Sequence, residues 1–384
     1  MIFRSQQNSH LALRLQITRP LKFSTYLGGA GDDYMRDMVV DRNGSIYLFC
    51  TTRSPIGTPL FPGQGGGFDA SVTKFNSDES DIIYSTHFGG SGEDRARNIS
   101  VDNAGNAYLI GVTTDSNTFP KQTVLGSPGG SLDIFVVKLN AAGNGLIYST
   151  VLGGTGADEG SDIAVDATGA AYFTGDTTST ETDYFPVQSY LPGHGTHGGP
   201  TGGYDSFVAM LNSNGNALVF STYFGGTGEE DGQGITLGPD GSIYITGSTG
   251  STTNFPLQNA WQSTNSGIMD AYVAKLRWNG ALVLDYSTYL GGSIYDGGKA
   301  IAVDDKNNVY FGGTTTSLNF PFSDGVVQPE HGGGDYDAFV AKFDANGSRV
   351  YATYLGGSEH QDGVWGIAVN EFGSVYLAGY TSTD

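Results

Sequence analysis

The chain has 384 residues, including 60 glycines, with 12% aromatic and 15% charged residues and a formal net charge of −21. Abundant glycine and aromatic residues with few charges indicate an all-β protein rich in turns. A charge this negative repels phosphate backbones and anionic headgroups, which excludes nucleic acid and membrane surfaces as expected partners. The single cysteine, Cys50, excludes an intramolecular disulfide framework.

The chain shows neither a membrane-spanning segment nor an export signal. No apolar run is long enough to cross a bilayer, so membrane insertion is not expected. Residues 1–20 lack the apolar core of a signal peptide.

One phrase recurs along the whole chain: an aromatic residue, Ser-Thr (Ala-Thr in the last copy), a variable residue, Leu or Phe, and Gly-Gly. Its Leu or Phe lies at Leu27, Phe88, Leu152, Phe224, Leu290 and Leu355. Between copies the order is constant: Ile-Ala-Val-Asp, a tight turn, Tyr-x-x-Gly-x-Thr, a Phe-Pro loop, and Asp-Ala-Phe-Val-Ala-Lys-Leu. Apolar residues alternate in each of these runs, which predicts four short strands per repeat.

In chain order, the first two predicted strands cover 11–16 and 23–27, and five complete four-stranded blades follow. The blades cover 37–88, 98–152, 162–224, 234–290 and 299–355. In the last of these, strands are expected at 301–304, 309–314, 337–343 and 349–355. Two further strands, 367–369 and 375–381, end the chain. We therefore predict one domain over 1–384, a six-bladed β-propeller of antiparallel strands closed by a shared blade from 9–27 and 366–382.

The phrases Tyr-Ser-Thr-Tyr-Leu-Gly-Gly, Ile-Ala-Val-Asp, Gly-Asn-x-Tyr and Asn-Phe-Pro resemble the bacterial β-propeller repeat called SBBP. Members are typically secreted or attached to the cell surface, so the resemblance implies an extracellular or cell-surface location. The family name implies seven blades, whereas six are counted here. The resemblance implies architecture and brings no catalytic residue to this sequence.

The expected site lies among the long loops between the second and third strands of each blade. These loops share one face with the links between blades, and long loops on a rigid scaffold commonly carry function. They cover 53–68, 115–132, 179–204, 250–269 and 317–336.

An acidic residue follows each Gly-Gly and is expected to form a ring at the mouth of the channel. The six positions are Asp33, Asp94, Asp158, Glu230, Asp296 and Asp362. Converging carboxylates are a candidate Ca²⁺ site, the one cofactor the sequence suggests, because Ca²⁺ is bound by oxygen ligands. The alternative is that each carboxylate caps its own turn by accepting backbone N–H groups.

Residues that break the repeat are the candidate ligand-binding positions on the long-loop face. They are Tyr190, His194, His197, Tyr204, Trp261, His331, His360 and Trp365. The histidines offer transition-metal ligands and the tryptophans a stacking surface for a sugar or peptide. The alternatives are solvent-exposed loop histidines and tryptophans that pack between blades.

Three function classes follow. The favoured one is an extracellular or cell-surface binding module that recognises a protein partner, glycan or matrix component through the long-loop face, with Ca²⁺ as a candidate ligand. The first alternative is a rigid component of a larger surface assembly. The second is a propeller hydrolase or lyase with an axial metal, for which no catalytic motif singles out residues.

Overall fold

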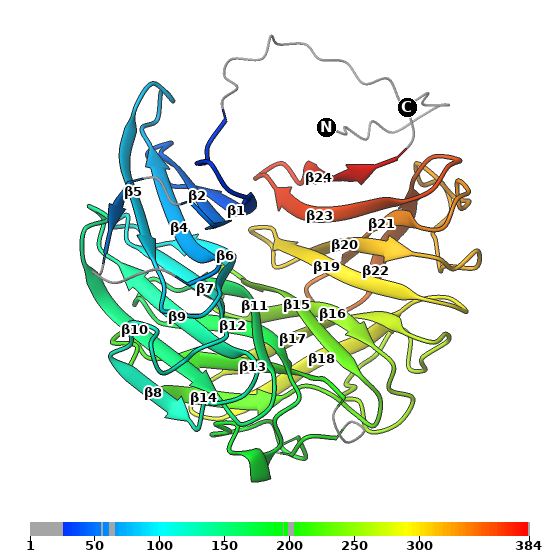
Figure 1. Ribbon diagram of the computed structural model, residues 1–384. Helices are drawn as coiled ribbons and strands as arrows, with labels where there is room; N and C mark the ends of the chain where they lie inside the picture. The colour runs from blue at the N-terminus through cyan, green and yellow to red at the C-terminus, as the bar shows by residue number, and fades with distance from the viewer. Residues whose placement is uncertain (1–25, 55–56, 61–65, 195, 199–202, 383–384) are drawn as a thin grey trace. The chain divides into compact units, whose positions relative to one another are not determined.

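The computed structural model describes residues 26–54, 57–60, 66–194, 196–198 and 203–382. These residues are all-β: their only helical segment is the single 3₁₀ turn η1 (Glu181–Asp183). The sheets belong to two compact units, one within Leu21–His197 and Thr201–Tyr223, the other from Phe224 onward (Figure 1). Each unit is described by itself.

The first unit holds three antiparallel sheets, two of which carry a short parallel strand at the outer edge. The first has the order β1 (Asp33–Val40), β2 (Ile46–Thr52), β4 (Asp69–Phe75), β5 (Ile82–Phe88), β3 (Thr58–Pro59). The second has β6 (Asp94–Val101), β7 (Ala107–Thr113), β9 (Asp133–Leu139), β10 (Leu146–Gly153), β8 (Thr123–Gly126). The third has β11 (Asp158–Val165), β12 (Ala171–Thr177), β13 (Asp205–Leu211), β14 (Leu218–Tyr223).

The second unit holds two four-stranded sheets and one two-stranded sheet. The first four-stranded sheet has the order β15 (Glu230–Leu237), β16 (Ile243–Thr249), β17 (Asp270–Trp278), β18 (Leu282–Leu290). The second has the order β19 (Asp296–Val303), β20 (Val309–Thr315), β21 (Asp337–Phe343), β22 (Arg349–Leu355). The two-stranded sheet is β23 (Asp362–Val369) and β24 (Val375–Thr381). The predicted strands at 11–16 and 23–27 lie outside the described residues except for Tyr26 and Leu27.

Each sheet is built from short hairpins, and the first turn holds an aspartate in every sheet but the last, where Asn370 takes its place. Asp41, for example, accepts the N–H groups of Asn43 and Ser45, both at 2.9 Å, while Gly44 takes a positive φ of 84°. An aspartate that caps the turn and a glycine that permits left-handed backbone together fix the register of both strands.

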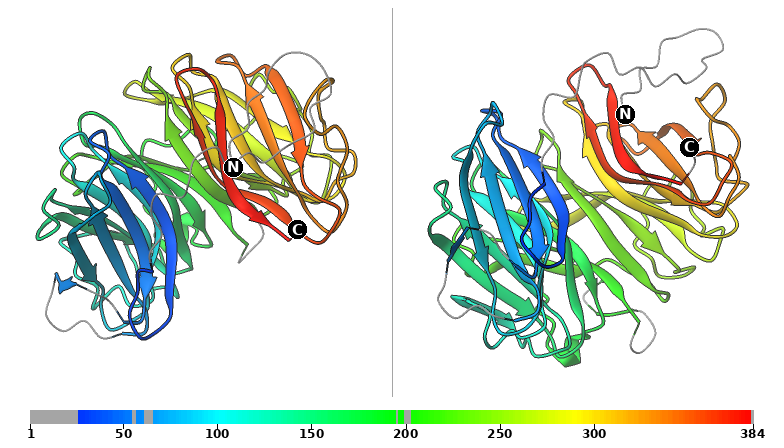
Figure 2. Two further views of the ribbon diagram at one scale, coloured as in Figure 1. Left: turned by 90° about the horizontal axis from the view of Figure 1, so that it is seen from above. Right: turned by 45° about the horizontal axis from the view of Figure 1, so that its top comes forward.

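The core lies between successive sheets, which pack face to face within each unit (Figure 2). The described phenylalanines of the Phe-Pro phrases, Phe119, Phe185, Phe255 and Phe320, are all buried. Phe320, for instance, lies 4.7 Å from Phe339, centroid to centroid. The long loops are thereby anchored into the apolar layers, as aromatic side chains of this size favour.

The first strand of each sheet is longer than the sequence predicted. The strand expected at 301–304 is β19, which begins at Asp296. Gly297 and Gly298 read as a link between blades, but they continue the pairing with β20, and the register shifts between Gly298 and Ala300. The extra length carries a β-bulge, which the sequence pattern did not reveal.

Candidate functional site

The first strand of every sheet contains a bulge that leaves one residue outside the pairing. In β1, Met35 pairs with Cys50 and Asp37 with Phe49, so Arg36 is the extra residue. The six bulge residues are Arg36, Arg97, Ser161, Gln233, Lys299 and Trp365. Bulges re-aim a side chain and occur next to active sites. The bulge is repeated in every sheet, but its extra residue varies: it is arginine in the first two sheets and serine, glutamine, lysine and tryptophan in the other four. A constant backbone feature with a variable side chain is the arrangement expected of function on a repeated scaffold.

In the first unit, the carboxyl group of Asp37 follows directly after a bulge residue. Its Oδ2 atom accepts the backbone N–H of Ile99 on β6 at 3.1 Å. Burial raises the pKa of Asp37 to about 6, against the opposing effect of that hydrogen bond. A carboxyl group with such a pKa holds its proton in part at neutral pH, which suits a general acid.

Three arginines lie on the same two strands as this carboxyl group and its hydrogen-bond partner, Arg36 on β1 and Arg95 and Arg97 on β6. The bulge residue Arg97 forms an ion pair with Glu159 of β11, 2.6 Å between Nη2 and Oε2. Arg95 forms an ion pair with Glu93. Arg36 lies 5.4 Å from the ring centroid of Tyr34 and, within the described parts of the chain, has no ion-pair partner.

The second unit presents different chemistry at the same bulge. Lys299 donates a hydrogen bond to Oε1 of Gln233. Trp365, one of the predicted ligand-binding residues, is 69% exposed and lies 5.5 Å from Tyr380, centroid to centroid. Its indole therefore has a free face, as a stacking surface requires.

The six predicted ring carboxylates are the first residues of the six first strands, and each contacts its own turn. The second glycine of the preceding Gly-Gly donates its N–H to the carboxylate in every sheet, as Gly154 does to Asp158 at 2.7 Å and Gly292 to Asp296 at 2.7 Å. The threonine that ends the second strand adds a hydroxyl donor to Asp33, Asp158, Glu230 and Asp296. Such hydrogen bonds are what the alternative to a Ca²⁺ site predicts, in which each carboxylate caps its own turn by accepting backbone N–H groups.

A second carboxylate, the aspartate that opens the third strand, lies close to the ring carboxylate of the next sheet. Gly153 separates one such pair: a Cβ atom there would lie 2.7 Å from both Asp133 and Asp158. Burial is the largest cause that raises the pKa of Asp158 to about 6, and the charge of Asp133 contributes. In the second unit, burial raises the pKa of Asp270 to about 7.

The contacts of these carboxylates decide whether they fit a metal ion. Their oxygens accept hydrogen bonds from glycine N–H groups and threonine hydroxyls, and among the described residues no three acidic, histidine or cysteine side chains are placed to hold one ion. Ca²⁺ takes six to eight oxygens. The residues therefore form no ready-made calcium site.

Two predicted histidines occupy equivalent buried positions, one in each unit. His197 Nδ1 lies 3.7 Å from Asp205 Oδ2, and its ring packs edge-on against Tyr223. His331 Nδ1 lies 3.8 Å from Asp337 Oδ2 and accepts the N–H of Gly333 at 3.1 Å. Both side chains are at most 5% exposed, so they pack beneath the loops and are not the solvent-exposed histidines of the alternative.

The other predicted residues are more exposed. Tyr190 is 52% exposed in the first unit, where His194 donates its backbone N–H to Leu191 and Tyr204 is half-buried before β13. In the second unit, the guanidinium of Arg349 lies 4.1 Å from the Trp261 ring, and His360 is exposed with a positive φ of 49°. The eight positions are divided equally between the two units.

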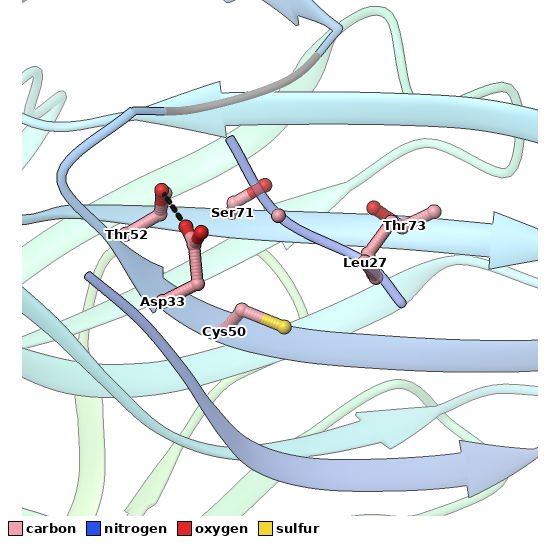
Figure 3. A pocket seen from close by; sticks show the side chains of 7 residues that line it. Leu27, Asp33, Cys50, Thr52, Ser71 and Thr73 are labelled. Carbon is pink, nitrogen blue, oxygen red and sulfur yellow. Dashed lines mark hydrogen bonds between the residues drawn. The ribbon is translucent and has the colours of Figure 1, made fainter. Parts of the chain in front are cut away.

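A small pocket beside β1 holds the single cysteine (Figure 3). Asp33, Cys50, Thr52 and Ser71 line it with Leu27, and it has room for about one water molecule. Burial raises the pKa of Cys50 to about 11, which keeps the thiol protonated and inert. The pocket is too small for a substrate.

The bulge residues are the functional candidates that sequence reasoning missed, Trp365 excepted. Each lies three positions after the ring acid, just before the residues where the first strand of the repeat was expected. The sequence did contain a signal for them, because the third position after the ring acid varies among the repeats while the residues around it are similar.

Three solved structures compare with the chain as follows. A structure of NanB with Optactamide matches with a TM-score of 0.51 and 9% identity over 94% of this chain and 68% of that one. A gluconolactonase from Xanthomonas campestris matches with a TM-score of 0.34 and 14% identity, over 92% of this chain and 96% of that one. An acylaminoacyl peptidase from Pyrococcus horikoshii matches with a TM-score of 0.41 and 12% identity, over 91% of this chain and 43% of that one. At these identities the likeness shows the fold alone. No curated protein matches the chain.

The predicted binding module is not supported by this comparison: the structure of NanB with Optactamide, whose TM-score exceeds 0.5, is similar to the chain in fold alone. Among the described residues, no helix is both long and apolar enough to cross a membrane. The family described as β-propeller repeat, SBBP, matches residues 22–55, 219–256 and 285–321. At these three places the chain thus matches the SBBP β-propeller repeat, in keeping with its antiparallel sheets.

Proposed function

We propose that the protein is a hydrolase whose reacting groups lie on the first strands of the first unit. The observation that carries the proposal is Asp37: a carboxyl group with a pKa of about 6 beside the bulge that aims Arg36. On the neighbouring first strands, Arg97 of β6 forms an ion pair with Glu159 of β11. A carboxyl group that is partly protonated near neutral pH, together with a second carboxyl group, provides the two partners of acid–base hydrolysis.

The reaction cleaves a C–O bond with water. Glu159 takes a proton from water while the water oxygen forms a bond to the substrate carbon. Asp37 gives its proton to the departing oxygen as the C–O bond breaks. Proton exchange with solvent then restores both side chains, so the net change is addition of one water molecule across the bond. No step is assigned to a metal.

The test uses paired substrates with a good and a poor leaving group, 4-nitrophenyl and phenyl β-D-glucosides, β-D-glucuronides and acetates. We expect the full chain to hydrolyse at least one pair. Asp37→Asn should lower the rate by about 100-fold for the phenyl member, because phenolate needs protonation, and by less for the 4-nitrophenyl member. Asp78→Asn, in an exposed hairpin of the same sheet, is the matched control. No hydrolysis of any pair, or equal rates for Asp37→Asn and the control, would overturn the proposal.

Calcium is tested separately. A Ca²⁺ ion at the ring carboxylates would have to replace the hydrogen bonds of their own turns. Millimolar Ca²⁺ after chelation should raise the melting temperature if a cation site exists, because a ligand of the folded state stabilises it. An unchanged melting temperature would leave the carboxylates as turn caps.

We further propose the closed six-bladed architecture and an extracellular or cell-surface location. The two-stranded sheet β23–β24 supports closure, since every other sheet has at least four strands and the last residues of β24 are exposed. Residues 11–16 match the β9 sequence, with Leu15 at the place of buried Leu139. Leu15→Asp should lower the melting temperature while Gln16→Asp does not; equal melting temperatures would contradict closure. Export of the full-length protein by its source cell tests the location.

A further inference from the structure

The chain carries 39 acidic and 18 basic residues, yet three arginines gather on two neighbouring first strands. Arg36 is the bulge residue of β1, and Arg97 is that of β6, two positions after Arg95. The strands are in contact at this point, since Asp37 of β1 accepts a hydrogen bond from Ile99 of β6. Like charges this close repel one another, so the cluster costs stability unless something neutralises it.

Internal acids neutralise only part of the cluster. Arg97 is paired with Glu159 and Arg95 with Glu93. Arg36 is exposed and has no acidic partner among the described residues. Burial, followed by the charges of Arg97 and Arg95, lowers the pKa of Arg36. Within the described residues, the Arg36 guanidinium is therefore left beside the Tyr34 ring without an acidic partner.

Aromatic residues extend from Arg36 toward the long loops. The Tyr34 ring lies 5.7 Å from that of Phe68, and the Arg53 guanidinium lies 4.1 Å from the Phe68 centroid. Tyr34 is 47% exposed. This row offers an apolar surface beside the cationic group, as a substrate with a ring and a charged substituent would require.

The blade itself does not need arginine at this position. The equivalent bulge residues of the other sheets include serine, glutamine and tryptophan. All of these sheets form with the same register shift, so the arginines are dispensable for the bulge.

We propose that Arg36, assisted by Arg97 and Arg95, binds an oxyanion group, a carboxylate or a phosphate, on the substrate of this site. Guanidinium groups bind either oxyanion through two parallel N–H donors. The inference deepens the proposed function and rests on it, because it names the substrate class of the same strands. The bound oxyanion would place the scissile bond beside Asp37, the next residue along β1.

Binding is measured by calorimetric titration of the full chain with inorganic phosphate and, separately, with citrate at low ionic strength. We expect saturable binding of at least one anion, weakened about tenfold or more in Arg36→Ala and less in Arg36→Lys. Arg277→Ala, which removes an exposed arginine paired with Asp285 in the second unit, is the matched control. Phosphate binding alone identifies a phosphate substrate, and citrate binding alone a carboxylate.

The two proposals fail separately. Asp37→Asn should still bind the anion although it no longer hydrolyses substrate. Hydrolysis that depends on Asp37 without any anion binding would overturn the oxyanion inference and leave the hydrolase. Binding of neither anion, or equal binding by wild type and an Arg36→Ala variant that melts like wild type, would also overturn it.

Discussion

Replacing Gly153 by alanine tests how the sheets are joined. The new Cβ atom would lie 2.7 Å from Asp133 Oδ1 and 2.7 Å from Asp158 Oδ2, whereas ordinary contact begins at 3.4 Å. Both carboxylates are buried, and Asp158 holds the N–H of Gly154. Overpacking of this kind costs about 1–3 kcal/mol, and disturbing a hydrogen bond to a buried charge adds about 1–2 kcal/mol.

Gly153→Ala should therefore lower the free energy of unfolding by about 2–5 kcal/mol, measured by urea titration. Gly129→Ala is the matched control, because its Cβ atom meets nothing nearer than 3.9 Å and its N–H can still donate to Asp133. The control should change stability by less than about 0.5 kcal/mol. Equal stability of the two variants would refute the view that glycine is required between the paired carboxylates.

Two further predictions concern buried polar groups. The pKa of Asp270 is raised to about 7, and those of Asp94 and Asp158 to about 6, so the stability that these carboxyl groups contribute is full below about pH 4 and is lost as the pH rises through 6 to 7. Urea titrations across that range should show this decline, with a smaller slope in Asp270→Asn; an unchanged slope would contradict the raised pKa. Tyr354→Phe should cost about 1–3 kcal/mol, because the hydroxyl donates to Ser317 at 2.7 Å and accepts the N–H of Phe320 at 2.9 Å. Tyr190→Phe, at an exposed tyrosine, should melt like wild type, and an equal loss in both variants would sink the reasoning.

Much of the fold could be predicted from the repeated phrases. Asp69, Asp133, Asp205, Asp270 and Asp337 open the third strands as expected, because alternating apolar residues follow each of them. The sequence also placed the ring acids at one position of each repeat. Their role depends on contacts between sheets, such as that between Asp158 and Asp133, which a linear pattern does not contain.

The candidate site was harder to predict. Glycines at 297 and 298 suggested a turn, because glycine favours turns, but here they allow two strands to approach closely within a bulge. The bulge residue, Lys299 in this sheet, therefore lay before the strand expected at 301–304. His197 and His331 stood out in the sequence because they break the repeat, yet burial beneath tyrosine rings gives them a packing environment.

The most direct test of the central claim is the pH dependence of hydrolysis by the full chain. If Asp37 donates the proton, the rate on a phenyl substrate should fall as the pH rises above about 6, and Asp37→Asn should lose both the rate and this pH-dependent limb. A variant that keeps the wild-type rate and pH profile, or a wild-type chain without hydrolytic activity, would contradict the assignment of catalysis to the first strands.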